Sequence, residues 1–497
     1  MLIVIIPFLS FALQSWPRFF NKYFGVDVWT RMIEADLVRK NGHKIPVKKI
    51  SGGFILSGFF NYPPVFPWLL SFFSKKTLLK VQGLIAPIFD VVQNLLVAFI
   101  TFQITGSWTT TILAQIIYAS IPLLPLENCS LCPRSLGYLN FTLAFYPLVL
   151  YSIVPNTLYL LTGIFFTILI FFTHKFATQS LLFITLFFTI FEKNSIYILT
   201  FLTGLVLAIV ISKGYYFRIY QGHIGNILFW VKNYPYRFSH QVRGLLKNKN
   251  KTDIVGQIYF LLLKFSPITL IGTNLWMISV FYFLLGKYFN LEFLPINNLL
   301  LFKMSLWVVF FYLLATFVLS FKILTPIGEG QRYLEMAVVP SSIIAAIIFS
   351  ALLRTDLALP AVSLLIIILA VNLLVTFILQ WKAIIKDRNR TMTQDMNKVF
   401  IFLNRIKPAP RILCIPHQIT TMILYNTNTQ VLVDIESGTL QKISDVFPIL
   451  KKSVKEIAKK YKLDLLVLKK DYASIKELKI PQKDVIFESD DTQVIKI

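Results

Sequence analysis

The chain has 497 residues, of which 56% are hydrophobic and 46 are Phe, and its mean hydropathy is +0.67. Ordinary globular domains are about 45–50% apolar, so the composition indicates an α-helical polytopic membrane protein. The formal net charge is +25, but the basic residues lie in loops between apolar segments. Nucleic-acid binding needs a soluble domain that presents a basic surface, so this distribution argues against it. Anionic membrane lipids are the favoured partners.

Apolar segments predict about eleven membrane-spanning helices. The first covers residues 1–13 and lacks the basic start and small-residue cleavage site of a signal peptide. Most of the others are long enough to cross about 30 Å of hydrocarbon, but 179–192 is short and is expected to be tilted or partly re-entrant. They are expected at about 82–104, 108–126, 138–154, 156–173, 179–192, 194–212, 256–286, 299–324, 334–353 and 357–381.

A large loop, residues 16–80, follows the first segment and carries Asp27. An ionisable residue beside a membrane span is a functional candidate. From Val28 to Lys40 apolar residues recur at helical spacing, which predicts an amphipathic helix on the membrane interface, with Arg31 and Glu34 on its polar side. Asp27 could also be no more than the N-cap of this helix.

Three patterns in this loop resemble the first exoplasmic loop of GT-C membrane glycosyltransferases: Asp-x-Trp-x-Arg-x-x-x-Ala at 27–35, Gly-x-x-x-Pro at 42–46 and Tyr-Pro-Pro at 62–64. These enzymes use polyprenyl-linked sugar donors and include the oligosaccharyltransferase catalytic subunits. In that family the acidic residue near the end of the first transmembrane helix is the catalytic or metal-binding carboxylate. The resemblance therefore implies that Asp27 is a general base or a ligand of a divalent ion, Mg or Mn. Supporting roles are expected for Glu34, His43 and Tyr62.

The second loop carries Pro-Arg-Ser-Leu-Gly at 133–137, similar to the Arg-Ser-x-x-Gly run that opens a helix in oligosaccharyltransferase-like enzymes. An acidic residue follows that run in the family, whereas Leu139 and Asn140 stand here, which weakens a two-carboxylate metal site. Glu127 could supply the second carboxylate, although it lies on the other side of the motif. Alternatively, Arg134 only extends toward lipid phosphates. Cys129 and Cys132, in the same loop, could close one small disulfide on an oxidising face.

The run 325–336 resembles the Arg-Tyr element of GT-C enzymes and contains Arg332 and Tyr333. A guanidinium offers a planar fork for two phosphate oxygens, so Arg332 is expected to bind the donor phosphate. Glu335, three residues later, is expected to pair with Arg332 and to hold its rotamer. Weaker candidates for binding the donor phosphate are Arg134, Lys175 and Arg218, and His174 is expected to be supporting.

Two rules disagree on topology. Residues 213–252 contain eight Lys and Arg residues and no acidic residue, which the positive-inside rule places in the cytoplasm. Alternation from a cytoplasmic amino terminus instead places this segment on the exoplasmic side with 16–80, 127–137, 174–178 and 322–333. We favour alternation because it gathers the candidate residues on one face: Asp27, Arg134, His174, Lys175 and Arg332.

Residues 382–497 lose the long apolar runs and are expected to form a small soluble α/β domain after the transmembrane domain, 1–381. A single glycine, Gly438, argues against nucleotide binding, and the absence of a Trp-Trp-Asp-Tyr-Gly motif disfavours asparagine-linked transfer. A helix is expected at about 445–461, and strands at 411–415, 420–425, 430–434, 463–468, 484–487 and 492–496.

The sequence thus predicts a multi-pass membrane glycosyltransferase in the plasma membrane of a prokaryote. It would move a sugar from a polyprenyl-phosphate donor to an exoplasmic glycan, lipid or protein, with inversion at the anomeric carbon. One alternative is a lipid or sugar transporter or flippase without catalytic activity, whose ionisable residues would lie within the spans. A second is a membrane scaffold whose active loop has decayed.

Overall fold

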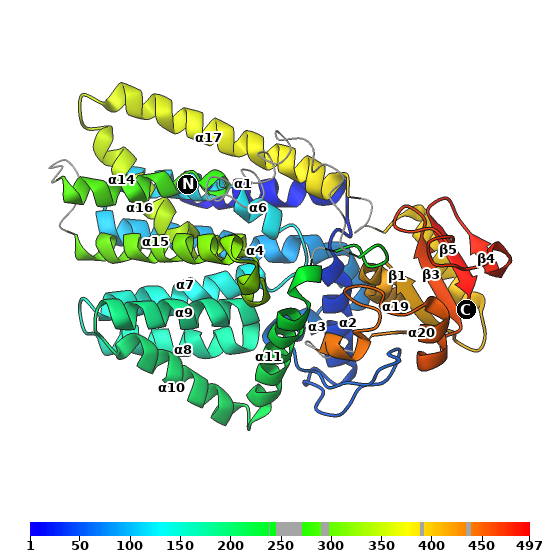
Figure 1. The fold of residues 1–497 in the computed structure, drawn as a ribbon. Helices are drawn as coiled ribbons and strands as arrows, with labels where there is room; N and C mark the ends of the chain where they lie inside the picture. The colour runs from blue at the N-terminus through cyan, green and yellow to red at the C-terminus, as the bar shows by residue number, and fades with distance from the viewer. Residues whose placement is uncertain (238, 245–270, 290–297, 388–391, 434–438) are drawn as a thin grey trace. The chain divides into compact units, whose positions relative to one another are not determined.

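The computed structural model describes residues 1–237, 239–244, 271–289, 298–387, 392–433 and 439–497 (Figure 1). These divide into two compact units. The composition predicts a boundary between 381 and 382. The units divide between Lys386 and Asp387, and the second unit also takes in parts of two earlier loops. The helical unit comprises Met1–Lys22, Gly83–Tyr216 and Asn250–Lys386, and the loop unit comprises Tyr23–Gln82, Phe217–Lys249 and Asp387–Ile497.

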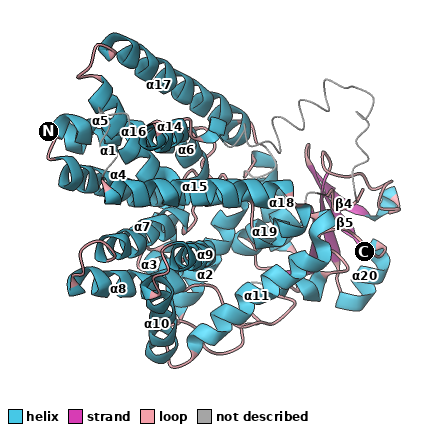
Figure 2. Cartoon of the chain, turned by 60° about the vertical axis from the view of Figure 1, so that its left-hand side comes forward, coloured by secondary structure: helices cyan, strands magenta, loops and turns pink. Residues whose placement is uncertain are grey.

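Apolar helices build the helical unit (Figure 2). Among the described residues, five helices are long and apolar enough to cross a membrane, and four more are shorter. Two 3-10 segments, η3 (Lys322–Ile327) and η4 (Gly330–Ala337), join α15 to α16. Residues 256–270 of an expected span lie outside the described residues, so the number eleven stays a prediction. The helices are α1 (Leu2–Ser15), α4 (Lys75–Thr105, which starts in the loop unit), α5 (Trp108–Ala119), α6 (Leu123–Glu127), α7 (Arg134–Tyr151), α8 (Thr157–Thr173), α9 (Lys175–Phe191), α10 (Ile196–Ile211), α14 (Met277–Tyr288), α15 (Leu299–Ser320), α16 (Val338–Leu352) and α17 (Ala358–Gln380).

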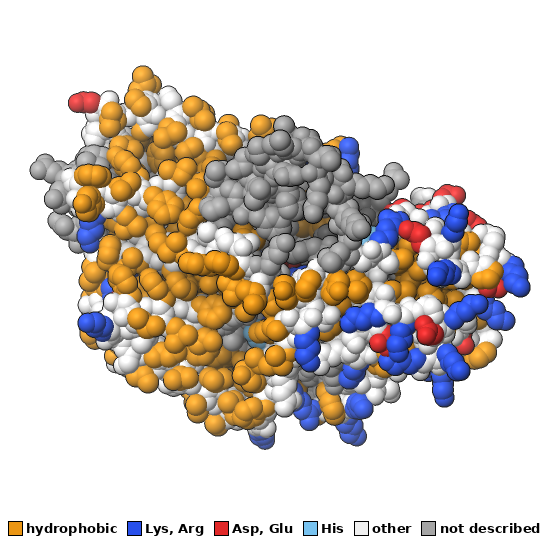
Figure 3. All heavy atoms as spheres, viewed as in Figure 1, with side chains coloured by type: hydrophobic (Ala, Val, Ile, Leu, Met, Phe, Trp, Pro, Cys, Tyr) orange, Lys and Arg blue, Asp and Glu red, His pale blue; other side chains and the backbone are white. Residues whose placement is uncertain are grey.

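The surface of this unit is that of an integral membrane protein. Hydrophobic side chains cover the face seen in Figure 3, and α17 exposes Leu359, Ile366 and Leu374. Inside, small residues let helices approach closely. A side chain at Gly163 would meet Leu148, and one at Gly204 would meet Thr167.

Two buried polar clusters tie these helices together. The Asp90 carboxylate on α4 accepts hydrogen bonds from Tyr118 Oη at 2.6 Å and Asn128 Nδ2 at 3.2 Å, and also from Gln14. Lys303 on α15 pairs with Glu192 at the end of α9, at 2.7 Å. A charge in an apolar interior is costly in free energy unless it is paired. Each cluster therefore favours one arrangement of the helices that it joins.

The loop unit is built on a five-stranded sheet of order β2-β1-β3-β5-β4. β1 is parallel to β2 and β3, and β5 is antiparallel to β3 and β4. The strands β1, β3, β4 and β5 confirm four expected strands. The strands are β1 (Arg411–Ile415), β2 (Gln430–Val431), β3 (Leu465–Lys469), β4 (Val485–Glu488) and β5 (Thr492–Lys496), and the helices are α2 (Val26–Lys40), α3 (Val65–Ser71), α11 (Tyr215–Asn233, which starts in the helical unit), α18 (Gln394–Arg405), α19 (Thr420–Asn426) and α20 (Val454–Tyr461).

Three expectations for this unit were wrong. Residues 420–425 form the helix α19 and not a strand. The side chains of Met422, Ile423 and Tyr425 are buried at a spacing that fits one face of a helix. The helix expected at 445–461 begins only at Val454, where Ser453 and Glu456 form a capping box. The strand expected at 430–434 is only the two residues of β2, and residue 434 lies outside the described residues.

Three segments far apart in sequence pack together within the loop unit. Residues of the first loop join the edge of the sheet, where Val431 N donates to Gly53 O and Ile55 N donates to Val431 O, both at 3.0 Å. Gln241 bridges to the carboxy-terminal segment, since its Nε2 donates to Val446 O at 3.0 Å. Because each segment contacts another directly, all three must lie on the same side of the membrane. Which side this is stays a prediction.

Candidate functional site

Asp27 lies in the first turn of α2, in the loop unit. The N-cap of α2 is Gly25, at φ 111°, so Asp27 is not the N-cap of this helix. Its side chain is exposed. A carboxylate in the first helical turn is stabilised by the positive end of the helix dipole. The position leaves the Asp27 carboxylate accessible to a substrate.

Arg31, one turn after Asp27, is buried, and so is Glu34, which overturns the expectation that both lie on a solvated face. Arg31 Nη1 bonds Glu34 Oε2 at 2.5 Å, and its guanidinium carbon lies 3.5 Å from the centre of the Tyr62 ring. Burial opposes the charge of Arg31, but Glu34, Tyr62 and Asp27 together raise the pKa of its guanidinium. Arg31 therefore stays charged and joins α2 to the Tyr-Pro-Pro turn.

His43 and Arg218 hold the backbone of the loop unit. His43 Nδ1 lies 2.9 Å from Ser71 Oγ, and its ring stacks on Phe72 at 4.8 Å. Arg218 Nη1 donates to Val47 O at 2.8 Å. These contacts show how the two side chains fix the first loop.

In the helical unit, the loop between α6 and α7 places Arg134 in an ion pair with Glu127. Arg134 also lies in electrostatic range of Glu335. The Glu335 side chain is 4% exposed, and neither of its carboxylate oxygens has a hydrogen-bond partner among the described residues. One guanidinium thus faces two carboxylates, one already paired and one buried without a hydrogen bond.

His174 lies at the junction of α8 and α9, directly before Lys175, and packs against the first turn of α7. A Cβ on Gly137 would come within 2.7 Å of His174, so only glycine permits this approach. The ring of Tyr138 meets His174 edge-on, with 6.1 Å between centres. His174 is 8% exposed, which places it between helices rather than in a loop.

Arg332 and Tyr333 lie in η4. Arg332 Nη2 pairs with Glu329 Oε2 at 2.9 Å, so the expected pairing of Arg332 with Glu335 is wrong. Tyr333 is fully buried, donates from Oη to Ile327 O at 2.9 Å and accepts from Gln179 Nε2 at 2.6 Å. Tyr333 therefore fixes η4 against α9, while Arg332 and Glu329 stay partly exposed.

Among the residues that the structure describes, no three His, Cys, Asp or Glu side chains come together as in an all-protein metal site. A Mg or Mn ion shared with a substrate phosphate would need only one or two carboxylates. Asp27 offers one carboxylate, and we derive no step through a metal; dependence on Mg or Mn stays a prediction. Cys129 and Cys132 are buried and are not joined by a disulfide.

The expected site residues fall into two groups, one in each unit. The helical unit holds Glu127, Arg134, His174, Lys175, Arg332, Tyr333 and Glu335, and the loop unit holds Asp27, Glu34, His43, Tyr62 and Arg218.

Three residues that contact the expected ones were not predicted from the sequence. Arg31 is the partner of Glu34, and an Arg three residues before a Glu in a helix is a signal for such a pair. The contacts of Glu329 and Gln179 depend on the tertiary structure.

No protein-family model and no curated protein matches the sequence. Among solved structures, the chain is similar to ArnT from Cupriavidus metallidurans bound to undecaprenyl phosphate. The likeness has a TM-score of 0.60, covers 99% of this chain and 97% of the ArnT chain, and is accompanied by 10% sequence identity. The chain therefore has the fold of ArnT, which confirms the expected architecture of membrane helices with a small carboxy-terminal sheet domain.

Proposed function

We propose that the chain is a membrane glycosyltransferase that transfers a sugar from a polyprenyl-phosphate donor to an exoplasmic acceptor. The observation that carries this proposal is the likeness to ArnT, which extends over nearly the whole of both chains, the helical unit and the sheet domain included. The solved ArnT structure holds undecaprenyl phosphate, so a lipid phosphate of that class is the natural donor to test. The plasma membrane of a prokaryote is the proposed location.

The donor phosphate is assigned to Arg332, with Arg134 and Lys175 as further cationic groups of the helical unit. A guanidinium stays charged at any relevant pH and can bind two phosphate oxygens. Arg332 and Arg134 are each held by a carboxylate, Glu329 and Glu127. Donor binding would exchange these carboxylates for phosphate oxygens, so neither arginine has to be desolvated without a partner.

Asp27 is assigned as the general base. Its exposed carboxylate would accept the proton of the acceptor hydroxyl as that oxygen attacks the anomeric carbon. The bond between that carbon and the phosphate oxygen breaks, and the lipid phosphate leaves with the electron pair. A single displacement of this kind inverts the anomeric configuration. Arg31 and Glu34 would position the helix that carries Asp27.

The test is the Asp27→Asn variant of the full chain in nanodiscs, supplied with a labelled undecaprenyl-phosphate sugar and membranes of the producing cells. Asn keeps the shape of the side chain but cannot accept the proton, so we expect label transfer to fall by about 10²-fold or more. The matched control is Asp395→Asn, an acidic residue at the corresponding second position of α18, whose transfer rate should match the wild type. Wild-type turnover in Asp27→Asn would remove Asp27 from the mechanism.

Transport without chemistry predicts a different result, and buried ionisable groups such as Asp90 are the feature that would favour it. Asp90 is, however, satisfied by hydrogen bonds from three neighbouring segments of the chain, as a structural carboxylate would be. A flippase would move the labelled lipid across the bilayer without breaking its sugar–phosphate bond. Intact donor recovered after translocation would therefore refute the proposed transferase.

A further inference from the structure

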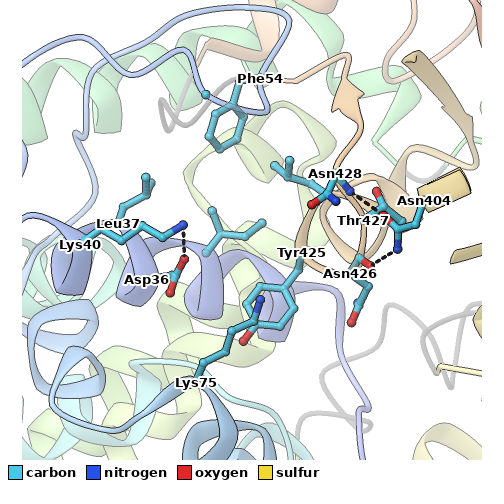
Figure 4. Close-up of a pocket in the computed structure, with 13 residues that line it drawn as sticks. Asp36, Leu37, Lys40, Phe54, Lys75, Asn404, Tyr425, Asn426, Thr427 and Asn428 are labelled. Carbon is cyan, nitrogen blue, oxygen red and sulfur yellow. Dashed lines mark hydrogen bonds and ion pairs between the residues drawn. The ribbon is translucent and has the colours of Figure 1, made fainter. Parts of the chain in front are cut away.

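A pocket of about 310 Å³ lies within the loop unit, between the second half of α2 and the turn that follows α19 (Figure 4). This volume is at the lower end of the range for small-ligand sites, about 300–1,000 Å³. Its lining joins residues that are almost four hundred positions apart in sequence. The polar side chains among them are Asp36, Lys40, Lys75, Asn404, Tyr425, Asn426, Thr427 and Asn428.

The three asparagines lie on one side of the pocket (Figure 4). Asn404 and Asn428 differ in the hydrogen bonds of their side chains. Asn404 shapes the wall, because its Nδ2 donates to Asn426 O at 3.3 Å and its Oδ1 accepts from Asn428 N at 2.9 Å. The side chain of Asn428 is exposed and makes no hydrogen bond to the described residues. A carboxamide both donates and accepts, which suits neighbouring hydroxyl groups of a ligand.

The opposite wall comes from α2. Asp36 is held by Arg39 at 2.8 Å and by Lys40 at 2.9 Å, so its carboxylate is fixed and its negative charge is paired. Lys75 lies over the ring of Tyr425, 4.5 Å from its centre. Between these polar groups, Leu37, Leu424 and Phe54 present apolar surface. Fixed polar groups beside apolar side chains fit a ligand that has hydroxyl edges and C–H faces.

We propose that this pocket is a saccharide-binding subsite that holds a part of the glycan acceptor away from its reacting hydroxyl. Its role in holding the acceptor rests on the proposed function, whereas the binding of a saccharide does not. Asp36 lies nine residues after Asp27 on α2, which corresponds to about 14 Å along the helix axis. Nine residues also turn the helix by half a revolution, so the pocket and Asp27 lie on opposite faces of α2. The pocket therefore recognises the acceptor without touching the reacting atoms.

Gly52 offers a way to block the pocket without disturbing the fold. It lines the cavity, its φ lies outside the left-handed region, and an added Cβ would meet no heavy atom within 4 Å. Gly52→Trp should therefore fill the cavity. Ser51→Trp, an adjacent exposed position that does not line the pocket, is its matched control. Asn428→Ala removes only the exposed carboxamide, and Asn397→Ala on α18 is the control for it.

The experiment has a binding arm and a transfer arm. In the first, oligosaccharides released by mild acid from the envelope of the producing cells are added to the full chain in nanodiscs, and saturation-transfer NMR reports their contact with protein. We expect binding in the wild type and in both controls, a loss in Gly52→Trp, and affinity weakened about tenfold in Asn428→Ala, as the loss of about 1.4 kcal/mol of hydrogen bonding would give.

In the transfer arm, the acceptor KM should rise in both pocket variants while donor affinity stays at the wild-type value. Equal saccharide binding by the wild type and Gly52→Trp, or none by the wild type, would overturn the subsite. Pocket-dependent binding without any sugar transfer would support the subsite as a saccharide site and refute the proposed transferase instead. The two failures are therefore distinguishable.

Discussion

The central carbon of the Arg31 guanidinium lies over the ring of Tyr62, 3.5 Å from the ring centre. This contact joins the helix that carries Asp27 to the Tyr-Pro-Pro turn, which lies much later in the first loop. Cations over aromatic rings are attracted by the ring's negative face, the more so when they are desolvated. With Glu34 completing the charge balance, Arg31 is the residue on which the local structure around Asp27 depends.

The first prediction concerns this pair. Arg31→Met should destabilise the loop unit by about 3–5 kcal/mol, because it leaves the buried Glu34 carboxylate without its partner. The double variant Arg31→Met/Glu34→Met removes both charges and should recover most of that loss. Hydrogen exchange of the α2 amides in the full chain measures the loss of stability in each variant. Equal protection in the single and double variants would show that the ion pair contributes nothing.

The second prediction concerns donor binding. Arg332→Lys keeps the charge but loses the planar fork, so affinity for undecaprenyl phosphate should fall by about tenfold. Glu329→Gln removes the carboxylate that occupies Arg332 and should instead tighten binding by about two- to fivefold, the scale of a partly exposed ion pair.

Native mass spectrometry of both variants with undecaprenyl phosphate gives the two affinities. Opposite changes would assign Arg332 to the phosphate. Weaker binding in both variants would mean that the Arg332–Glu329 pair acts as a structural unit, and unchanged binding in both would place the phosphate elsewhere.

The sequence predicted most apolar helices of the helical unit, because long apolar runs are almost sufficient to define membrane helices. It did not predict that the expected span 108–126 is divided into α5 and α6. It failed where tertiary packing decides the local structure. Thr420 to Tyr425 has the β-branched and aromatic composition of a strand, yet it forms α19, whose Tyr425 ring packs 5.6 Å from Trp29 of α2. The subsite could not be predicted, since Asp36 and Asn428 come together only when the first loop packs on the sheet domain.

The third prediction concerns pH. Burial lowers the pKa of His417 to about 4, below the ordinary value of about 6.5. The unfolded segment therefore binds a proton between about pH 6.5 and 4 that the folded one does not, so stability is full above pH 6.5 and falls with pH in that window. Burial also lowers the pKa of His240, despite its bond to Tyr472 O, so it adds to the same slope.

Hydrogen exchange of residues 411–426, measured in the full chain at pH 7.0 and 5.0 and corrected for intrinsic rates, tests this slope. His417→Asn should lose part of the acid destabilisation and keep the part that His240 contributes. Carboxylates such as Glu477, whose pKa Arg243 lowers from 4.5 to about 2, act below about pH 4.5 and leave the measured interval between pH 7.0 and 5.0 clear. An unchanged slope in His417→Asn would show that the ring is not neutral in the folded chain.

The last prediction concerns the side of the membrane. The contacts within the loop unit require its three segments to share one side, and an even number of crossings must then separate each from the next. We predict that this side is exoplasmic, because long soluble segments translocate largely regardless of their charge. The basic residues after α17 would by themselves favour the cytoplasm.

Single cysteines at Lys44, Lys232 and Asn397, all exposed, report on one segment each in a background without Cys129, Cys132 and Cys414. An impermeant thiol reagent should label all three on intact cells. Labelling of all three only after the membrane is opened would place the unit in the cytoplasm, where it could not act on an exoplasmic acceptor. A mixed pattern would contradict the packing of the first loop on the sheet domain and remove the saccharide subsite with it.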